Sequence, residues 1–221
     1  MFVSHIFADK TDLPDLPACL YQYVAGANGL FVRAARPGLE ALIPVSLTRE
    51  PVRGLAVVAP YVRLSSLVWR YMADRLFLDA WRQGNKEKLY YFKLNQSIVG
   101  AQRSNPWYVD TPKQIQSAGG VHPVDPFAAG TETVLEVHSH HGMAAFFSRT
   151  DDNEERGGFR LFAVVGRLTA KRPEIRCRVG IYGHFWEIPA GWVFDLPPYV
   201  KDTLDPEYEQ EVVYEDILES A

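Results

Sequence analysis

The chain has few cysteines, no long apolar run and no surplus of basic residues, and each of these features narrows what it can be. Among its 221 residues, Cys19 and Cys177 are the two cysteines. Two are too few for the disulfide framework of a small secreted domain, so we expect free, buried thiols in a reducing cytoplasm. No apolar stretch approaches the ~20 residues that cross a bilayer, and Met1–His5 lacks the charged start of a signal peptide. We therefore expect a cytoplasmic protein with no membrane partner.

The charge balance argues against a nucleic-acid partner. The chain has 23 Lys and Arg against 27 Asp and Glu, a formal net charge of −4. Binding to phosphate backbones needs clustered basic residues, which this balance does not favour. The charge is also uneven, because residues 202–221 hold eight acidic residues and no basic one. With 47% hydrophobic and 13% aromatic residues, we expect a folded globular body that ends in an acidic tail.

A pair of histidines ends a predicted strand. Residues 133–137 alternate and are rich in β-branched side chains, which predicts a strand. Side chains on a strand repeat every two residues, so His138 and His140 project from one face. Seven residues later, Ser148 and Asp151 stand three apart and would share one face of a helical turn. Two imidazoles and a carboxylate are three protein ligands, which leaves the fourth position of Zn²⁺ for water.

The second half of this pattern also has a simpler interpretation. Ser148 and Asp151 precede the acidic run 152–155, and this order is typical of a helix start with a capping serine and an acidic first turn. A single His on a strand is more often a core or surface residue than a ligand. Capping and metal binding are compatible, because one helix start can do both.

The full pattern resembles the signature of the JAMM (JAB/MPN-plus) zinc metalloprotease family, in its prokaryotic branch. That signature is His-Ser/Thr-His, seven residues, then Ser-x-x-Asp. Its positions are filled here by His138, Ser139, His140, Ser148 and Asp151. Many members carry Pro after the second His, where this chain has His141. This departure does not change the ligand residues, but it affects the shape of the loop that follows. We expect His141 to lie at the rim of the site and not to be a ligand.

The resemblance covers about residues 60–190 and implies both a fold and an activity. The fold would be α/β: an MPN/JAB domain with a cytidine-deaminase-like mixed sheet flanked by helices. The cofactor would be Zn²⁺, held by His138, His140 and Asp151. Members hydrolyse the isopeptide or peptide bond after the C-terminus of ubiquitin or a ubiquitin-like protein, so the implied partner is such a protein or its conjugates.

The resemblance also implies two catalytic residues. Members place a catalytic Glu after the first helix, at the start of a hydrophobic strand, roughly fifty residues before the His pair. Glu87 fits this position, and an exposed Glu at a strand edge is the alternative. Glu132 and Glu136 compete with it, and Glu136 has the strand parity of the histidines, so it could also face the metal. Ser148 would donate a hydrogen bond to the developing oxyanion.

The rest of the chain divides by composition into three parts. Residues 1–59 hold short apolar runs separated by Pro and Gly, and predict an N-terminal extension of strands and turns. The first 28 residues of this extension are turn-rich and lack periodicity. Residues 60–200 would form the JAB/MPN domain, and residues 201–221 an acidic C-terminal tail.

Within the predicted domain, periodicity places several elements. Apolar residues at helical spacing from Leu64 onward predict a helix that is capped by Ser65 or Ser66 and runs to about Gln83. An aromatic-rich strand over 87–94 follows. Pro- and Gly-rich residues 95–130 predict an irregular loop that borders the substrate groove. In that loop we expect Trp107 and Tyr108 to be buried, and we assign no role to His122. Two strands over 159–166 and 175–182 would form a hairpin. Its basic residues could attract an acidic partner or the chain's own tail, but we expect them on a solvated face: Arg167, Lys171, Arg172, Arg176 and Arg178.

A narrower resemblance suggests further partners. Residues 144–152, residues 178–183 and the N-terminal extension resemble the A proteins of the plasmid-associated PRTRC cassette. That cassette also encodes a ThiF-like activating enzyme, a ubiquitin-like protein and a ParB-like protein, which implies the first two as partners.

Two other functions stay open. A module with the same fold could bind a ubiquitin-like or cassette partner without catalysis, and a correct ligand set without a working Glu would favour it. A zinc hydrolase for a small amide would be favoured by a groove that offers no edge to a peptide strand.

Overall fold

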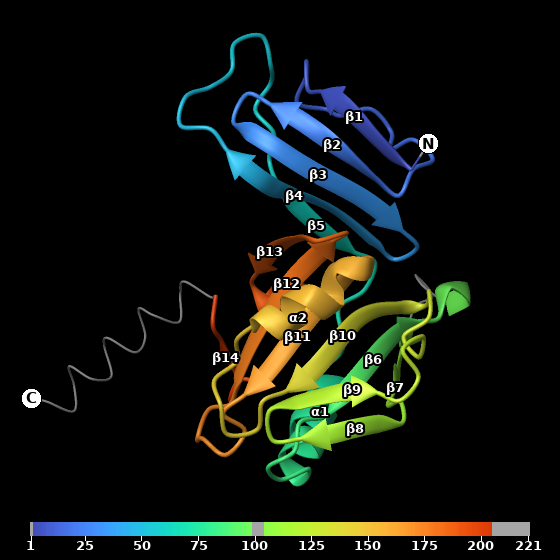
Figure 1. Cartoon of the computed structure of the whole chain (residues 1–221), viewed down its shortest axis with the longest axis vertical. Coiled ribbons are helices and arrows are strands. Elements are labelled where there is room, and N and C mark those ends of the chain that lie inside the picture. The colour runs from blue at the N-terminus through green and yellow to red at the C-terminus, as the bar shows by residue number, and fades with distance from the viewer. Residues whose placement is uncertain (1, 99–103, 205–221) are drawn as a thin grey trace, which may run out of the picture.

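The computed structural model describes residues 2–98 and 104–204, so the part of the predicted acidic tail beyond residue 204 lies outside the described residues. The chain is a mixed α/β protein with two large sheets and few helices (Figure 1). In the described part of the chain, no helix combines the length and the apolarity needed to cross a membrane.

The N-terminal strands form a five-stranded sheet in the order β1-β2-β3-β4-β5 (Figure 1). Their bounds are β1 Val3–Phe7, β2 Tyr21–Gly26, β3 Gly29–Arg36, β4 Leu39–Leu47 and β5 Tyr61–Leu64. β1 and β2 pair in parallel, and the other neighbours pair antiparallel. Because β5 pairs with β4, this sheet continues past residue 59 into the region predicted for the second part of the chain.

Two of these strands lie within residues 1–28, which the sequence predicted to be turn-rich and without periodicity, so that prediction is wrong in part. In β2, the buried positions are Gln22, Val24 and Gly26, while Tyr21 and Tyr23 are half-buried. Gln22 is buried because its Oε1 accepts a hydrogen bond from Nε of Arg33, at 2.8 Å. One polar side chain therefore shares the buried face with Val24, while the aromatic residues are on the half-buried face, so the apolar alternation that marks a strand is weak in the sequence.

The second large sheet has seven strands and carries the predicted His strand. Its main path runs β13-β12-β11-β10-β6-β7, and β14 pairs with β12. The bounds are β6 Leu89–Leu94, β7 Trp107–Asp110, β10 Thr133–Ser139, β11 Phe159–Gly166, β12 Glu174–Ile181, β13 His184–Ile188 and β14 Lys201–Asp202. β10 and β11 are parallel and lie inside the sheet. Both are almost continuously buried. β11 is also mostly apolar, as is usual for a strand covered on both faces, whereas β10 carries polar side chains at alternate positions.

The region predicted as an irregular loop contains strands as well, so the prediction for residues 95–130 is wrong in part. β7 extends the large sheet, and β8 Gln114–Ser117 and β9 Gly120–Pro123 form a separate hairpin. Trp107 is buried as expected, with its Nε1 donating to the carbonyl of Ser66 at 3.1 Å. Tyr108 is not, since 44% of it is exposed.

The helices are α1 Arg70–Arg82 and α2 Arg149–Glu154, with short 3-10 turns η1 Gln96–Ile98, η2 Glu155–Gly157 and η3 Ala190–Trp192. α1 ends where the sequence predicted but begins at an N-cap, Trp69, that makes no side-chain cap. Leu64 is instead the last residue of β5, and Val68 forms an isolated bridge with Phe194. Both residues thus lie outside α1, although their spacing continues its apolar stripe and both pack on the same core.

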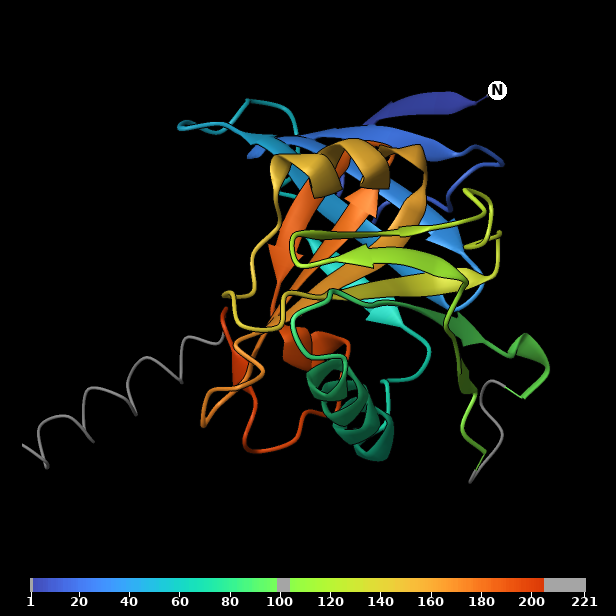
Figure 2. The same ribbon diagram turned by 60° about the horizontal axis from the view of Figure 1, so that its bottom comes forward.

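The large sheet has two different faces at β10. Leu135 and Val137 belong to the main core, which also holds Ile43 of the N-terminal sheet and Leu76 of α1. The N-terminal sheet therefore packs on the rest of the chain through a shared core. Glu136 and His138 alternate with the core residues and line a pocket on the opposite face. α1 and α2 lie apart, with strands of this sheet between them (Figure 2).

Candidate metal centre

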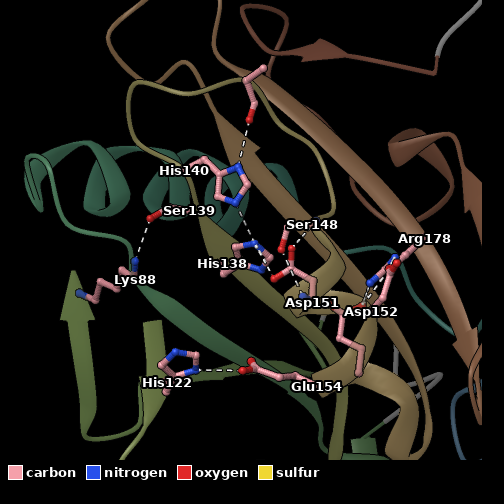
Figure 3. Close-up of polar contacts among 12 residues, drawn as sticks. Lys88, His122, His138, Ser139, His140, Ser148, Asp151, Asp152, Glu154 and Arg178 are labelled. Carbon is pink, nitrogen blue, oxygen red and sulfur yellow. Dashed lines mark hydrogen bonds and ion pairs between the residues drawn. The ribbon is translucent and has the colours of Figure 1, made fainter. Parts of the chain in front are cut away.

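The two histidines meet at the end of β10, as their strand parity predicts. His138 is in the strand and His140 directly follows it, and both are buried. Their Nε2 atoms are 3.2 Å apart (Figure 3). Burial lowers the pKa of His138 to about 4. The imidazole is therefore neutral at ordinary pH, which is the form that binds a metal ion.

His140 is fixed by the loop that follows it. Its Nδ1 is 3.0 Å from the carbonyl oxygen of Ala144. An Nδ1–H that donates to this carbonyl leaves the Nε2 lone pair directed at His138, as in histidine ligands held by a backbone acceptor. The loop has little freedom where it passes β11, because a Cβ on Gly166 would come within 2.5 Å of the backbone nitrogen of Ala145.

His141 explains why this loop differs from one with Pro after the second His. Its φ is +26°, which an L-residue adopts rarely. Pro holds φ near −65° and could not take this conformation. His141 also accepts a hydrogen bond through its carbonyl oxygen from the backbone nitrogen of Leu168, at 2.7 Å. The residue thus shapes the loop, and its side chain is not part of the ligand group.

Asp151 comes from the start of α2, where capping and metal-ligand geometry coincide. Ser148 is the N-cap, and its Oγ accepts from the backbone nitrogen of Asp151 at 3.2 Å. In return, the backbone nitrogen of Ser148 donates to Oδ2 of Asp151 at 2.6 Å. This capping box occupies one carboxylate oxygen. The other, Oδ1, lies 3.6 Å from Nε2 of His138.

The three side chains have the spacing of a zinc ligand set. One ligand atom from each of His138, His140 and Asp151 lies within 4.8 Å of the other two. Ligand atoms about 2.0–2.1 Å from a tetrahedral Zn²⁺ stand about 3.4 Å apart. The separations of 3.2 and 3.6 Å from Nε2 of His138 are close to this value. Two neutral imidazoles with one carboxylate also fit zinc in donor type, so the residues present fit the metal.

Glu87 lies in the wall of the same pocket, just before β6. The pocket has a volume of about 270 Å³ and is lined by the three candidate ligands, Ser148, Glu87, Glu136 and residues of the β8–β9 hairpin. Glu87 is 4% exposed, so it is not the exposed strand-edge residue of the alternative. Burial, and then the nearby carboxylate of Asp151, raise its pKa to about 7. A carboxylate with a pKa near neutrality can both take and give a proton at pH 7.

The backbone around Glu87 is held from two sides. Its nitrogen donates to the carbonyl of Ser117 at 2.9 Å, and its carbonyl accepts from Nε2 of Gln116 at 2.7 Å. The backbone nitrogen of Lys88 donates to Oγ of Ser139 at 2.9 Å (Figure 3). Ser139 is fully buried. The serine between the two histidines therefore ties the His strand to the segment that carries Glu87.

The competing glutamates have different surroundings. Glu136 lines the pocket, and burial raises its pKa to about 7 although Arg160 opposes the shift. Its Oε2 is 3.6 Å from Nη1 of Arg160. Glu132 accepts a long hydrogen bond from Tyr108, at 3.4 Å, and does not line the pocket. Of the three glutamates, Glu87 and Glu136 are thus in a position to contact a substrate.

The raised pKa of Glu87 makes the stability of the metal-free chain depend on pH. Because its folded-state pKa of about 7 is above the usual 4.5, the folded state binds the proton more tightly, and this contribution to stability is lost as pH rises from 4.5 to 7. Glu87→Gln mimics the protonated form. We expect its melting temperature to exceed that of the wild type by on the order of a few degrees at about pH 8, and the gap to close at about pH 5. Thermal unfolding with a chelator measures this; a gap that does not change with pH would contradict it.

Two residues near the pocket were missed or misplaced by the sequence analysis. Arg178 was expected on a solvated face but is 4% exposed and pairs with Asp152 and Glu155, so that prediction is wrong. His122, which had no assigned role, comes from β9, and its Nδ1 lies 3.2 Å from Oε1 of Glu154 (Figure 3). This ion pair links the hairpin to α2 at the edge of the pocket.

The central part of the chain is similar to a known protein family. Residues 77–179 match the model of a family described as prokaryotic homologs of the JAB domain. The matched part runs from α1 into β12, and it contains Glu87, both histidines and Asp151. A search of curated proteins found no match.

Proposed function

We propose, from the match of residues 77–179 to the prokaryotic JAB family model, that the chain is a zinc-dependent peptidase or isopeptidase of the JAMM type. Its substrate would be the bond after the C-terminus of a ubiquitin-like protein. The observation that carries the proposal is the grouping of His138, His140 and Asp151 within 4.8 Å in one pocket wall. JAB-domain proteins include peptidases and binding modules, so the residues of the pocket must decide between them.

His138, His140 and Asp151 would hold the metal through two Nε2 atoms and one carboxylate oxygen. When bound, zinc would supply a Lewis acid that lowers the pKa of a water molecule and polarises the scissile carbonyl. The chain's own contribution begins with the arrangement of these ligands. The carbonyl of Ala144 fixes the ring of His140, and the backbone nitrogen of Ser148 fixes Asp151.

Glu87 would act as the general base and then as the general acid. It would take a proton from the attacking water and later deliver it to the leaving amine. Its burial and raised pKa support both steps, because neither protonation state is strongly disfavoured near pH 7. Its backbone contacts with Ser117 and Gln116 would keep the carboxylate in place between the steps.

The substrate would enter as an extended chain end. The β8–β9 hairpin borders the pocket through Gly119, Gly120 and Val121. Among the described strands, β8 and β9 pair only with each other, so the outer edge of β9 is not part of a larger sheet. β8 is tied to the segment before β6 through the carbonyl of Ser117. An extended tail can add to such an edge through main-chain hydrogen bonds. This edge favours a peptide substrate over a small amide.

A direct test combines metal content with hydrolysis of a ubiquitin-like fusion protein. We expect one zinc per chain and cleavage directly after the ubiquitin-like C-terminus. Zinc without cleavage, together with binding of the uncleaved ubiquitin-like protein, would point to the non-catalytic binding module. A ThiF-like activating enzyme would be a second partner, independent of the hydrolysis assay. Co-purification of the chain with such an enzyme tests this expectation.

Ser148→Ala should slow turnover while the metal stays bound. Oγ of Ser148 accepts from the backbone nitrogen of Asp151, and a hydroxyl can donate at the same time. We propose that this proton is directed at the oxyanion that develops on the scissile carbonyl. Its loss should lower kcat by roughly a hundredfold or more with little change in KM. Steady-state kinetics and metal content check this, and near-normal turnover would contradict the role.

A further inference from the structure

The helix that carries Asp151 has no apolar anchor. α2 consists of six residues, Arg149–Glu154, and none of them is buried. The capping box fixes Asp151 only relative to Ser148, which belongs to the same short segment. A helix of this length has little stability of its own, so contacts from elsewhere in the chain must place it against the histidines.

Arg178 of β12 supplies such contacts. Its side chain is 5% exposed, and all of its hydrogen bonds go to the α2–η2 segment. Nη1 donates to Oδ1 of Asp152 at 2.6 Å, while Nε and Nη2 donate to Oε2 of Glu155 at 2.8 and 2.5 Å (Figure 3). Asp152 directly follows Asp151, and Glu155 lies one helical turn further on.

Two aromatic rings contact the guanidinium group of Arg178. Its Cζ is 3.9 Å from the ring centroid of Phe147 and 4.1 Å from that of Phe185. Phe147 directly precedes the capping residue Ser148. Arg178 therefore contacts the chain on both sides of Asp151: Phe147 before it, and Asp152 and Glu155 after it.

From this geometry we propose that Arg178 is a positioning residue, which holds Asp151 at ligand distance from His138 and His140. The proposal rests on the proposed function, because it assigns the metal as the ion that Asp151 would bind. A buried ion pair by itself is weak evidence for stability, since desolvation offsets most of the attraction. The three donors and the two ring contacts instead fix the orientation of the α2–η2 segment.

Lys in place of Arg178 separates positioning from charge. A Lys ammonium keeps the positive charge but can neither stack between two rings nor donate in a planar, divergent arrangement. Arg178→Lys should therefore leave the chain folded and let the α2–η2 segment move. We expect zinc affinity to fall by about 10–100-fold, the range found when groups that orient metal ligands are lost.

Arg36→Lys is a matched control. Arg36 is also a partly buried arginine that spans distant segments, and it donates to the backbone carbonyls of Thr131, Thr133 and Phe159. These lie at or before the start of β10 and β11, at the other end of the His strand. Its loss should lower the melting temperature without changing zinc affinity.

The experiment measures two quantities on the full chain. Zinc affinity comes from competition with a chromogenic chelator, for the wild type, Arg178→Lys and Arg36→Lys. Amide hydrogen exchange over residues 148–155 is followed in the metal-free proteins, so that it does not depend on zinc. We expect Arg178→Lys alone to weaken zinc binding and to speed exchange in this segment by about tenfold or more.

The outcomes are distinguishable. Zinc affinity of Arg178→Lys within twofold of the wild type, with unchanged exchange, would overturn the positioning role. So would an equal loss of affinity in Arg36→Lys, because general destabilisation would then be the cause. A wild-type chain that binds no zinc would overturn the proposed metal centre; unchanged exchange in Arg178→Lys would then overturn the positioning of Asp151 as well.

Discussion

A Glu87→Gln chain is expected to bind zinc as the wild type does and to lose about 10²–10⁴-fold in kcat for a ubiquitin-like fusion. Gln has nearly the shape of Glu, and the contacts that hold this position are made by its backbone, with Ser117 and Gln116. The substitution therefore removes the proton acceptor and leaves the segment in place. Metal content and single-turnover hydrolysis, measured on the same preparation, test both halves of the expectation.

Glu136→Gln is the matched control for this experiment. Glu136 lines the same pocket, and burial raises its pKa to about 7 as well. It differs in its partner, because its carboxylate faces Arg160 at 3.6 Å. We expect Glu136→Gln to change kcat by less than about tenfold. A large loss in Glu136→Gln with near-normal turnover in Glu87→Gln would assign the base to Glu136 instead.

The central part of the candidate site could be predicted because its geometry is local. The parity of a strand puts His138 and His140 on one face, and a capping box puts Asp151 beside Ser148. Both rules act over a few residues and hold in almost any fold. They also explain why the two interpretations of Ser148 and Asp151 were compatible: the cap uses Oδ2 of the aspartate and leaves Oδ1 free for a metal.

Contacts between distant segments could not be predicted in the same way. Arg178 alternates with the apolar Cys177 and Val179, so its position on the opposite face of β12 follows from the sequence. That this face is covered by an acidic segment does not, because β12 and α2 come together only in the folded chain. The residues after Asp151 include three carboxylates, at 152, 154 and 155. These carboxylates are the sequence signal that could have indicated a cationic partner for this segment.

The N-terminal strands and α1 were misjudged for a related reason. In β2, the buried Gln22 is paired with Arg33 of the next strand, and its own polarity gives no sign of this burial. Val68 has the right spacing to belong to α1, but its backbone nitrogen donates to the carbonyl of Val193 at 2.9 Å. In both places, a partner far along the chain decides which side chains are buried. Periodicity read within one segment cannot contain that information.

His138→Ala should weaken zinc binding and hydrolysis together, and this is the largest effect on the metal that we expect from a single substitution. Its Nε2 is the atom that lies near both other ligands, at 3.2 Å from His140 and 3.6 Å from Asp151. If an apparent binding free energy of about 10–16 kcal/mol is shared among three ligands, loss of one costs about 3–5 kcal/mol, or about 10²–10⁴-fold in affinity.

His122→Ala is the control for a general effect of removing an imidazole from the pocket. His122 lines the same pocket but is half exposed and pairs with Glu154, away from the ligand group. Its removal should leave zinc affinity within about threefold of the wild type, since surface ion pairs contribute little. Equal losses in the two variants would indicate a general effect of removing an imidazole from the pocket. Retention of one zinc per chain in His138→Ala would show that His138 is not a ligand, and the mechanism built on the histidine pair would fail with it.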